Sequence, residues 1–153
     1  MPFYSEACFD PDNSIGYLVR RTNQLGAAAL EPVFADHGLT YTQWQALVSI
    51  WFGRGMTAAD LARDLGHDKG ATTRLVDMLS DKGWITREPS PDDRRRIALA
   101  LTDAGEAVTL ACKKDVVACW NRWLSDWPQE DARTLILLLQ RLRATLVEAG
   151  PCA

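Results

Sequence analysis

Three consecutive arginines, Arg94, Arg95 and Arg96, follow the acidic pair Asp92 and Asp93 in this 153-residue chain. A guanidinium group stays charged at physiological pH and binds phosphate oxygens or the edge of a guanine in a bidentate manner. An arginine on a narrow loop can also enter the minor groove of DNA, where the negative potential is enhanced. A neighbouring carboxylate can hold such a guanidinium in position. The cluster is therefore a candidate for nucleic-acid contact, with a solvated turn of mixed charge as the alternative.

A second group of residues suited to contact with DNA lies upstream of the arginines. Its members are small or carry hydrogen-bond donors, and they are Lys69, Gly70, Ala71, Thr72, Thr73 and Arg74. They follow the tight turn Gly66-His67-Asp68, which separates two short segments with helical apolar spacing. In a helix-turn-helix, the N-terminal residues of the second helix reach base edges in the major groove. The pattern therefore predicts a DNA-reading helix, with an ordinary helical hairpin as the alternative.

Residues that could support catalysis or bind a metal are few and scattered. The cysteines and histidines are Cys8, His37, His67, Cys112, Cys119 and Cys152, and no two cysteines form a C-x-x-C pair. This spacing is unlike that of zinc sites. The sequence also lacks a glycine-rich phosphate loop and a paired nucleophile and base. We therefore expect no enzymatic activity, no metal and no cofactor, and we expect the thiols to be reduced.

The composition is that of a globular protein, with 47% hydrophobic and 24% charged residues. The length fits one domain. No apolar run approaches the roughly 18 residues of a membrane span, and the first 12 residues do not resemble a secretory signal. These observations predict a soluble, cytoplasmic protein that does not bind membranes.

The net charge of −3 is unfavourable for DNA binding, but the charge is unevenly distributed. Residues 63–96 contain eight Lys and Arg against seven Asp and Glu, whereas the rest of the chain contains nine against thirteen. Local charge governs contact with a polyanion more than the total does. The basic excess is small, and it coincides with the two candidate groups.

The elements that must position these residues follow from the apolar periodicity. From Ser14 the apolar residues recur at helical spacing until Gly38, which ends the first helix. Thr42, with Gln45 three residues later, predicts the capping box of a second helix. Two further short helices are expected to begin after an N-cap and to end at a glycine, Thr57 to Gly66 and Asp68 to Gly83.

After residue 83 the apolar period changes from 3.6 to 2. Residues 84–88 and 96–101 are predicted to be two strands, joined by the proline-rich segment 89–95. The arginines would then lie at the tip of a hairpin. Thr102 starts a long helix, and Trp127-Pro128 separates it from a last helix that ends at Gly150. The predicted fold class is mainly α with a small β-hairpin wing.

The last helix carries more apolar surface than a thin helical layer can hide by itself. Its seam consists of Leu135, Leu138, Leu139, Leu142 and Leu146, with Trp120, Trp123 and Trp127 nearby. An apolar face of this kind commonly marks a partner surface. We therefore expect a homodimer, with an intramolecular bundle core as the alternative.

Three segments resemble the MarR family of winged helix-turn-helix regulators. The run DRRRIALALTDAG at 93–105 resembles the wing signature of that family, an Asp-x-Arg followed by a strand ending in Leu-Thr and a glycine three residues later. The run TRLVDMLSDKGWITR at 73–87 resembles the recognition helix and first wing strand, and LTYTQW at 39–44 resembles the entry to the second helix. The resemblance covers residues 14–148. It implies a homodimer that binds a pseudo-palindromic operator and is released by a ligand or by oxidation.

The resemblance also implies a role for most residues of the two candidate groups. Arg95 would enter the minor groove, and Asp93 would position it. The other implied DNA contacts are Thr72, Thr73 and Arg74 in the major groove, Lys69 on phosphate, and Arg94 and Arg96 as supporting charges. Residues 14–37 and 103–148 would form the dimerisation helices of a single unit, 14–148. Residues 42–101 would form its winged helix-turn-helix lobe, between a flexible arm, 1–13, and a tail, 149–153.

Many members of the family bind small aromatic acids or phenols between the dimerisation helices and the DNA-reading lobe. Tyr17, Arg20, Trp44 and Trp51 could line such a site, although aromatic residues at helical spacing are more often core. A thiol switch is the rival mechanism, but residues 15–24 lack the cysteine that hydroperoxide sensors of the family carry in their first helix. The alternatives to a ligand-released repressor are thus a redox-sensing regulator and a winged-helix protein-interaction adaptor.

Overall fold

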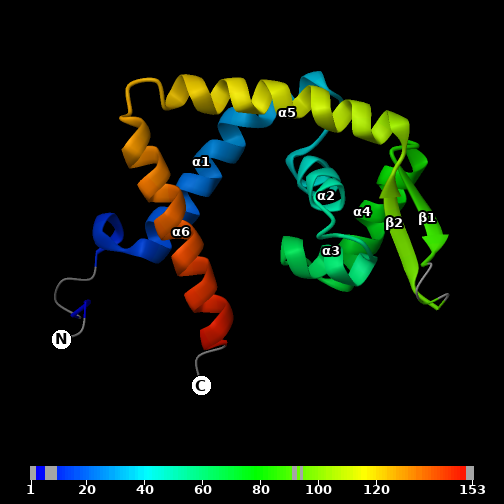
Figure 1. Ribbon diagram of the computed structural model, residues 1–153, viewed down its shortest axis with the longest axis horizontal. Coiled ribbons are helices and arrows are strands. Elements are labelled where there is room, and N and C mark those ends of the chain that lie inside the picture. Colours follow the sequence, from blue (N-terminus) through cyan, green and yellow to red (C-terminus); the bar gives the residue numbers. More distant parts are fainter. Residues whose placement is uncertain (1–2, 6–9, 91–92, 94, 151–153) are drawn as a thin grey trace. The chain divides into compact units, whose positions relative to one another are not determined.

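The computed structural model describes residues 3–5, 10–90, 93 and 95–150, and Figure 1 labels its helices and strands. In chain order these are η2 (Pro11–Asn13), α1 (Ile15–Asp36), α2 (Tyr41–Trp51), α3 (Ala58–Leu65), α4 (Lys69–Asp81), β1 (Ile85–Pro89), β2 (Ile97–Leu101), α5 (Asp103–Trp123) and α6 (Gln129–Ala149). Over the described ranges, the helices and the single two-stranded sheet confirm the predicted fold class. The residues discussed above that lie outside the described ranges are Cys8, Pro91, Asp92, Arg94 and Cys152.

Two compact units make up the chain, residues 1–116 and 117–153, and each is described by itself. The first contains α1 to α4, both strands and the larger part of α5. Within the segment expected to be a flexible arm, Asp10 caps the single turn of η2. Its carboxylate accepts hydrogen bonds from the backbone N–H groups of Asp12 and Asn13, at 2.9 and 3.2 Å.

Two of the three predicted helix caps, Thr57 and Asp68, are confirmed, and the third, Thr42, is wrong. The side chains of Ser14, Thr57 and Asp68 each accept a hydrogen bond from a backbone N–H in the first turn of α1, α3 and α4. The second helix instead has its capping box at Thr40 and Gln43, two residues before the predicted pair. The Thr40 hydroxyl accepts from the Gln43 N–H at 3.2 Å, and the Gln43 side chain accepts from the Thr40 N–H at 3.1 Å. Both pairs have the same spacing, but only Thr40 has the extended backbone of an N-cap.

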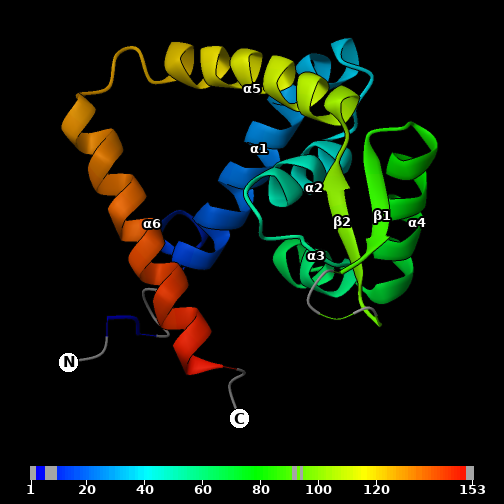
Figure 2. The same cartoon turned by 45° about the vertical axis from the view of Figure 1, so that its right-hand side comes forward.

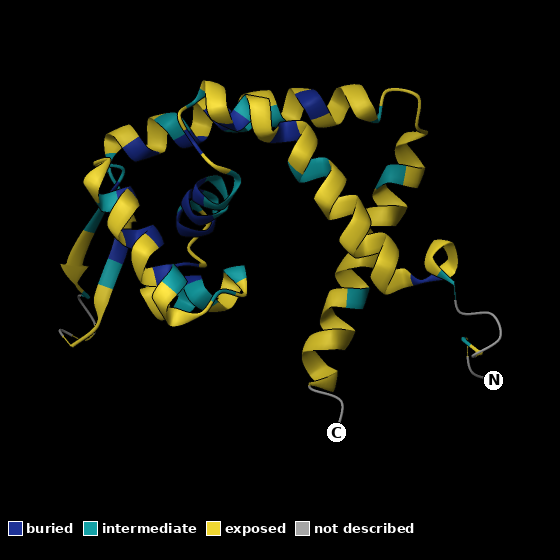
Figure 3. Ribbon diagram, turned by 180° about the vertical axis from the view of Figure 1, so that it is seen from behind, coloured by how far each residue is buried: buried dark blue, intermediate teal, exposed yellow. Residues whose placement is uncertain are grey.

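One core joins the helix-turn-helix to the hairpin. Phe34, Leu47, Leu61, Leu79 and Leu99 come from five different elements, and each exposes at most 2% of its surface. Buried positions of this unit are dark blue in Figure 3. Full burial of one such side chain stabilises the fold by roughly 1.5–3 kcal/mol. The hairpin is therefore part of the folded body and not an appendage.

The hairpin pairs in a single register and is joined by a third segment. Strands β1 and β2 are antiparallel, with Ile85 opposite Leu101 and Pro89 opposite Ile97. On its other side β2 contacts the chain just before α3. The Leu99 N–H donates to the Met56 carbonyl at 2.9 Å, and Thr57 forms a bridge with Ala98. Figure 2 shows the resulting hairpin beside α4.

The junction between the hairpin and α5 explains the Leu-Thr and glycine of the sequence signature. The Thr102 hydroxyl donates to the Gly83 carbonyl at 2.6 Å and accepts from the Gly105 N–H at 3.0 Å. The Thr102 N–H donates to the Trp84 carbonyl at 3.0 Å. A Cβ atom at position 105 would lie only 1.9 Å from the carbonyl oxygen of Trp84. Only glycine allows this close approach of the helix to the hairpin.

The second unit, residues 117–153, exposes a large apolar surface. Leu135, Leu138, Leu139 and Leu146 of α6 each expose between 43% and 63% of their surface. Trp120 and Trp123 stack edge to face at 5.1 Å and are also exposed. None of the helices within the described residues is both long and apolar enough to cross a membrane.

Candidate nucleic-acid interface

The N-terminus of α4 presents three of the four predicted DNA-reading residues at the surface. Asp68 caps the helix by accepting a hydrogen bond from the Ala71 N–H at 2.8 Å. That bond is the main reason why the pKa of Asp68 lies below its ordinary value. Gly66, with φ of 65°, makes the tight turn before the cap. Lys69, Thr73 and Arg74 are exposed in the first two turns, where the helix dipole also favours anions.

Thr72 does not belong to this surface, so the prediction for this residue is wrong. Its side chain is 1% exposed, and its hydroxyl donates to the Asp68 carbonyl at 2.9 Å. A side chain buried this deeply cannot reach a base edge, whereas Thr73, whose hydroxyl makes the same kind of bond to the Lys69 carbonyl, is exposed. The apolar spacing already carried this signal, since Thr72 lies three, four and seven residues before the buried Leu75, Val76 and Leu79.

The described part of the wing tip is a tight turn built on Asp93. The Asp93 carboxylate accepts a hydrogen bond from the backbone N–H of Arg95 at 3.0 Å, and its carbonyl accepts from the Arg96 N–H at 2.9 Å. The Ser90 N–H closes the loop by donating to the Arg96 carbonyl at 2.7 Å. Asp93 therefore fixes the backbone of Arg95, whereas a contact with a guanidinium was expected. The Arg95 side chain is exposed.

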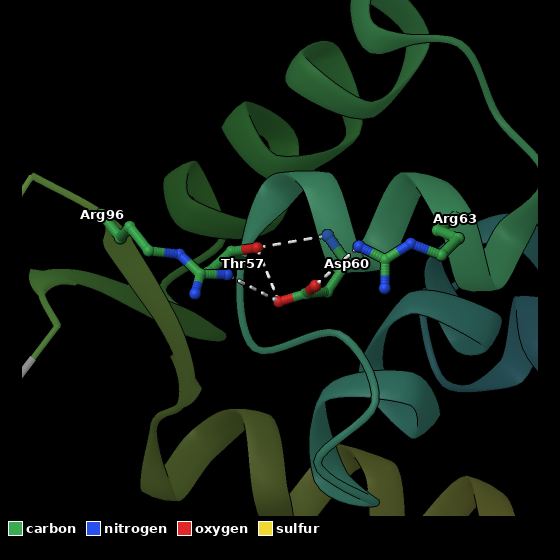
Figure 4. Close-up of polar contacts among 4 residues, drawn as sticks. All are labelled: Thr57, Asp60, Arg63 and Arg96. Atoms are coloured by element: carbon green, nitrogen blue, oxygen red, sulfur yellow. Dashed lines mark hydrogen bonds and ion pairs between the residues drawn. The ribbon is translucent and has the colours of Figure 1, made fainter. Parts of the chain in front are cut away.

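Arg96 lies against the helix-turn-helix through Asp60, as Figure 4 shows. The Asp60 carboxylate accepts hydrogen bonds from the Thr57 hydroxyl at 2.7 Å and from Arg63 at 3.1 Å, and one of its oxygens lies 3.6 Å from Arg96. The Thr57 hydrogen bond, with smaller effects of Arg63 and Arg96, holds the pKa of Asp60 below its ordinary value despite partial burial. Asp60 was not among the predicted site residues. Its place three residues after the capping Thr57 was visible, but its contact with the wing was not.

A second ion pair connects the wing to the recognition helix. Arg87 of β1 donates to Asp77 of α4 at 2.5 Å. At the end of α4, the Lys82 ammonium donates to the Gly38 carbonyl at 2.7 Å and lies 4.3 Å from the centre of the Trp84 ring. Arg87 in β1 and Arg96 just before β2 thus form ion pairs with α4 and α3, respectively.

The four residues predicted to line a ligand site are not brought to one place. The Arg20 guanidinium lies over the Tyr17 ring at 5.1 Å on the exposed part of α1. Trp44 stacks on Phe34 with ring centres 6.0 Å apart, and Lys113 covers the Trp51 ring at 4.4 Å. Of the four predicted residues, Trp44 lines a groove.

Three grooves in the described part of the first unit are large enough for a small molecule, and two of them include predicted site residues. One, of about 400 Å³, lies along α2 and α3 and is lined by Trp44, Gln45, Val48, Ser49, Phe52, Arg54, Asp64 and Leu65. The other, of about 620 Å³, lies beside α4 and is lined by Thr40, Thr42, His67, Ala71, Arg74, Leu75, Asp77 and Met78. The first combines the aromatic Trp44 and Phe52 with one cation, Arg54, and one carboxylate, Asp64. The second includes Arg74, a predicted DNA contact.

The two cysteines within the described ranges are buried. Cys112 exposes 0% of its surface and Cys119 exposes 9%. Burial, with a smaller effect of Asp115, raises the pKa of Cys112 to about 11. A thiol with such a pKa forms little thiolate near neutral pH and is therefore a poor redox sensor.

Comparison with known proteins agrees with this geometry. Residues 39–97 match the model of the MarR family. The multiple antibiotic resistance protein MarR of Escherichia coli is 34% identical over 129 residues, which cover 84% of this chain and 90% of that protein. The organic hydroperoxide resistance transcriptional regulator of Bacillus subtilis is 26% identical over 94 residues, which cover 61% of this chain and 64% of that regulator.

Solved structures share the same fold. CouR from Rhodococcus jostii bound to p-coumaroyl-CoA superposes with a TM-score of 0.76 and 25% identity, covering 87% of this chain and 94% of CouR. A MarR mutant from Escherichia coli complexed with operator DNA superposes with a TM-score of 0.72 and 28% identity, covering 88% of this chain and 97% of the mutant.

Proposed function

This chain belongs to the MarR family of transcriptional regulators, and we propose that it is a homodimeric, cytoplasmic repressor that a small aromatic molecule releases from a pseudo-palindromic operator. The observation that carries the proposal is the exposure of Thr73 and Arg74 at the start of α4 together with that of Arg95 on the wing. An exposed helix N-terminus beside a basic hairpin tip is the arrangement that reads adjacent grooves of a duplex. We expect no enzymatic activity.

The two surfaces divide the work between the grooves. Arg74 and Thr73 would contact base edges in the major groove, and Lys69 would bind phosphate there. Arg95 would enter the minor groove, with its backbone held by the Asp93 turn. Arg94 remains a proposed supporting charge and lies outside the described residues.

The exposed apolar face of α6 supports the dimer. Leu135, Leu138, Leu139 and Leu146 recur at helical spacing, and each exposes at least 43% of its surface. Such a stripe would bury itself against a second copy of the chain. A two-fold dimer would then match an operator with two similar half-sites.

DNA binding is tested by fluorescence anisotropy with the duplex that lies upstream of the gene for this chain. We expect Arg95→Ala to weaken binding by about 1 kcal/mol or more, roughly fivefold. Arg21→Ala removes the same charge from an exposed position of α1 and should change the affinity little. Equal affinities of Arg95→Ala and the unaltered chain would contradict the role of the wing. An affinity that does not change with salt would indicate a protein-interaction adaptor, because phosphate contacts make binding salt-dependent.

The groove along α2 and α3 is our proposed effector site. Trp44 and Phe52 offer aromatic faces, and Arg54 offers a charge for an anionic group. Asp64 also lines the groove, and its carboxylate accepts a hydrogen bond from the Ser49 hydroxyl at 2.6 Å. CouR, a structural relative, was solved with p-coumaroyl-CoA. We therefore propose an aromatic anion as ligand, and p-coumarate and p-coumaroyl-CoA are the probes for a thermal-shift measurement. Arg54→Gln should abolish the shift, and a shift of the same size in that variant would place the ligand elsewhere. The buried Cys112 supports a ligand over a thiol switch.

A further inference from the structure

We infer that Asp60 is a positioning residue for the wing: through Arg96 it fixes the hairpin against α3, so that Arg95 is held ready for the minor groove. The inference rests on the proposed function, because it concerns how the wing reaches DNA. It also reassigns Arg96. That residue was expected to be a supporting charge for DNA, but in the structure it lies against a carboxylate of the same chain.

The geometry singles out Asp60 as a fixed anchor. Its side chain is 20% exposed, and its Oδ2 atom accepts the Thr57 hydroxyl at 2.7 Å while lying 3.6 Å from Arg96 Nη2. The Thr57 hydroxyl in turn accepts the Asp60 N–H at 3.2 Å, so the carboxylate is oriented by the cap of its own helix. The Arg63 guanidinium occupies the other oxygen, Oδ1, on the opposite side in Figure 4.

The contact between Asp60 and Arg96 affects the wing tip because of where Arg96 lies in the chain. Arg96 directly precedes β2, whose middle is already attached to residues 56 and 57. Its backbone N–H and carbonyl close the tip turn with Asp93 and Ser90. Fixing the Arg96 side chain therefore restrains the strand end that carries Arg95.

Two possible roles of Asp60 predict opposite changes in DNA affinity when its charge is removed. If Asp60 contributed only its charge, its neutralisation would strengthen DNA binding, because a carboxylate near phosphates is repulsive. If Asp60 positions the wing, its neutralisation weakens binding to the specific duplex and leaves binding to random duplex unchanged or slightly tighter. The ratio of the two affinities therefore separates the models.

The experiment measures that ratio for the full chain at several salt concentrations. The probes are the duplex upstream of its gene and a random-sequence duplex of equal length. We expect Asp60→Asn and Arg96→Gln each to lower the ratio by about two- to fivefold, as for an exposed ion pair. The double variant should lower the ratio no further than either single variant, because the two residues act through one contact. The conservative Asp60→Glu should restore the ratio.

Arg63→Gln is the matched control, since it removes the other guanidinium from the same carboxylate without touching the wing. It should leave the ratio unchanged. The salt dependence of binding to the specific duplex should be the same for Arg96→Gln as for the unaltered chain, whereas loss of a phosphate contact would reduce its slope by about 0.9. Thermal melts identify any variant that fails to fold. If Asp60→Asn does not fold, the test rests on Arg96→Gln, which changes an exposed side chain.

A higher or unchanged ratio for Asp60→Asn, or a double variant with the summed effect of both single changes, would overturn the inference. A reduced salt slope for Arg96→Gln would overturn it as well and return Arg96 to phosphate contact. The proposed function fails, and this inference with it, if the unaltered chain does not distinguish the two duplexes. The same holds if Arg95→Ala binds the specific duplex as tightly as the unaltered chain. Discrimination that depends on Arg95 but not on Asp60 refutes the positioning role alone.

Discussion

Gly105→Ala should destabilise the chain strongly, because the added Cβ would collide with backbone atoms. The added Cβ would lie 1.9 Å from the Trp84 carbonyl oxygen and 2.8 Å from the carbonyl carbon, whereas ordinary contacts begin at 3.4 Å. The start of α5 and the backbone at Trp84 must therefore separate by about 1.5 Å. That movement would lengthen the hydrogen bond from the Thr102 N–H to the Trp84 carbonyl, which is 3.0 Å in the structure.

The expected magnitude follows from these two effects. Overpacking a tight contact costs about 1–3 kcal/mol, and a weakened hydrogen bond costs roughly 0.5–1.5 kcal/mol. We expect a total loss of about 3 kcal/mol, because the neighbouring atoms are backbone and cannot rotate away. For a chain of this size that corresponds to a drop of about 6–12 °C in the midpoint of unfolding.

The assay is thermal and urea unfolding followed by circular dichroism, at one protein concentration because a dimer melts in a concentration-dependent way. Gly16→Ala is the matched control. A Cβ there has no atom within 4 Å, and alanine favours a helix over glycine by up to about 1 kcal/mol. If Gly105→Ala melts within a degree or two of the unaltered chain, the close approach at this junction is not what requires glycine.

Two further predictions concern side chains whose burial decides their role. Thr72→Val keeps the shape of the side chain but removes a buried hydroxyl, so it should lower the midpoint of unfolding with little change in DNA affinity. Thr73→Val changes an exposed residue, so it should weaken DNA binding with little change in the midpoint of unfolding. Anisotropy and melting curves on both variants check this. Cys112, with its pKa raised from 9.0 to about 11 by burial and by Asp115, should resist iodoacetamide at pH 8 in the folded chain and react in urea, as mass spectrometry would show. Because the folded state holds this proton more tightly, the thiol's contribution to stability is complete below pH 9 and is lost as the pH rises through about 11, a loss that Cys112→Ser should not show.

The local parts of the structure could be predicted from the sequence because their causes are local. Thr57 and Asp68 cap helices within three residues of themselves, so spacing alone identifies them. Thr42 failed because Thr40 offers the same spacing two residues earlier, and the choice depends on where the chain leaves α1. Thr72 failed because residue chemistry was given more weight than the apolar period of its own helix.

The contacts that set the wing could not be predicted in this way. Asp60 and Arg96 lie 36 positions apart in the sequence, and their contact depends on the register of β2 against the segment before α3. Asp77 and Arg87 likewise depend on how β1 lies beside α4. A sequence pattern gives the faces of a strand or helix, but it does not give the partner of a surface charge.

Contacts of this kind also explain why the excess of basic over acidic residues in 63–96 is so small. Four of the seven acidic residues in that segment accept hydrogen bonds from the protein: Asp64 from Ser49, Asp68 from Ala71, Asp77 from Arg87 and Asp93 from Arg95. They cap a helix, shape a turn or connect elements, so their number reflects the architecture of the lobe. Lys69 and Arg74 at the start of α4 and Arg95 on the wing tip are exposed instead. A duplex approaching these two places meets Lys69, Arg74 and Arg95, and the count of charges along the chain therefore understates the local attraction.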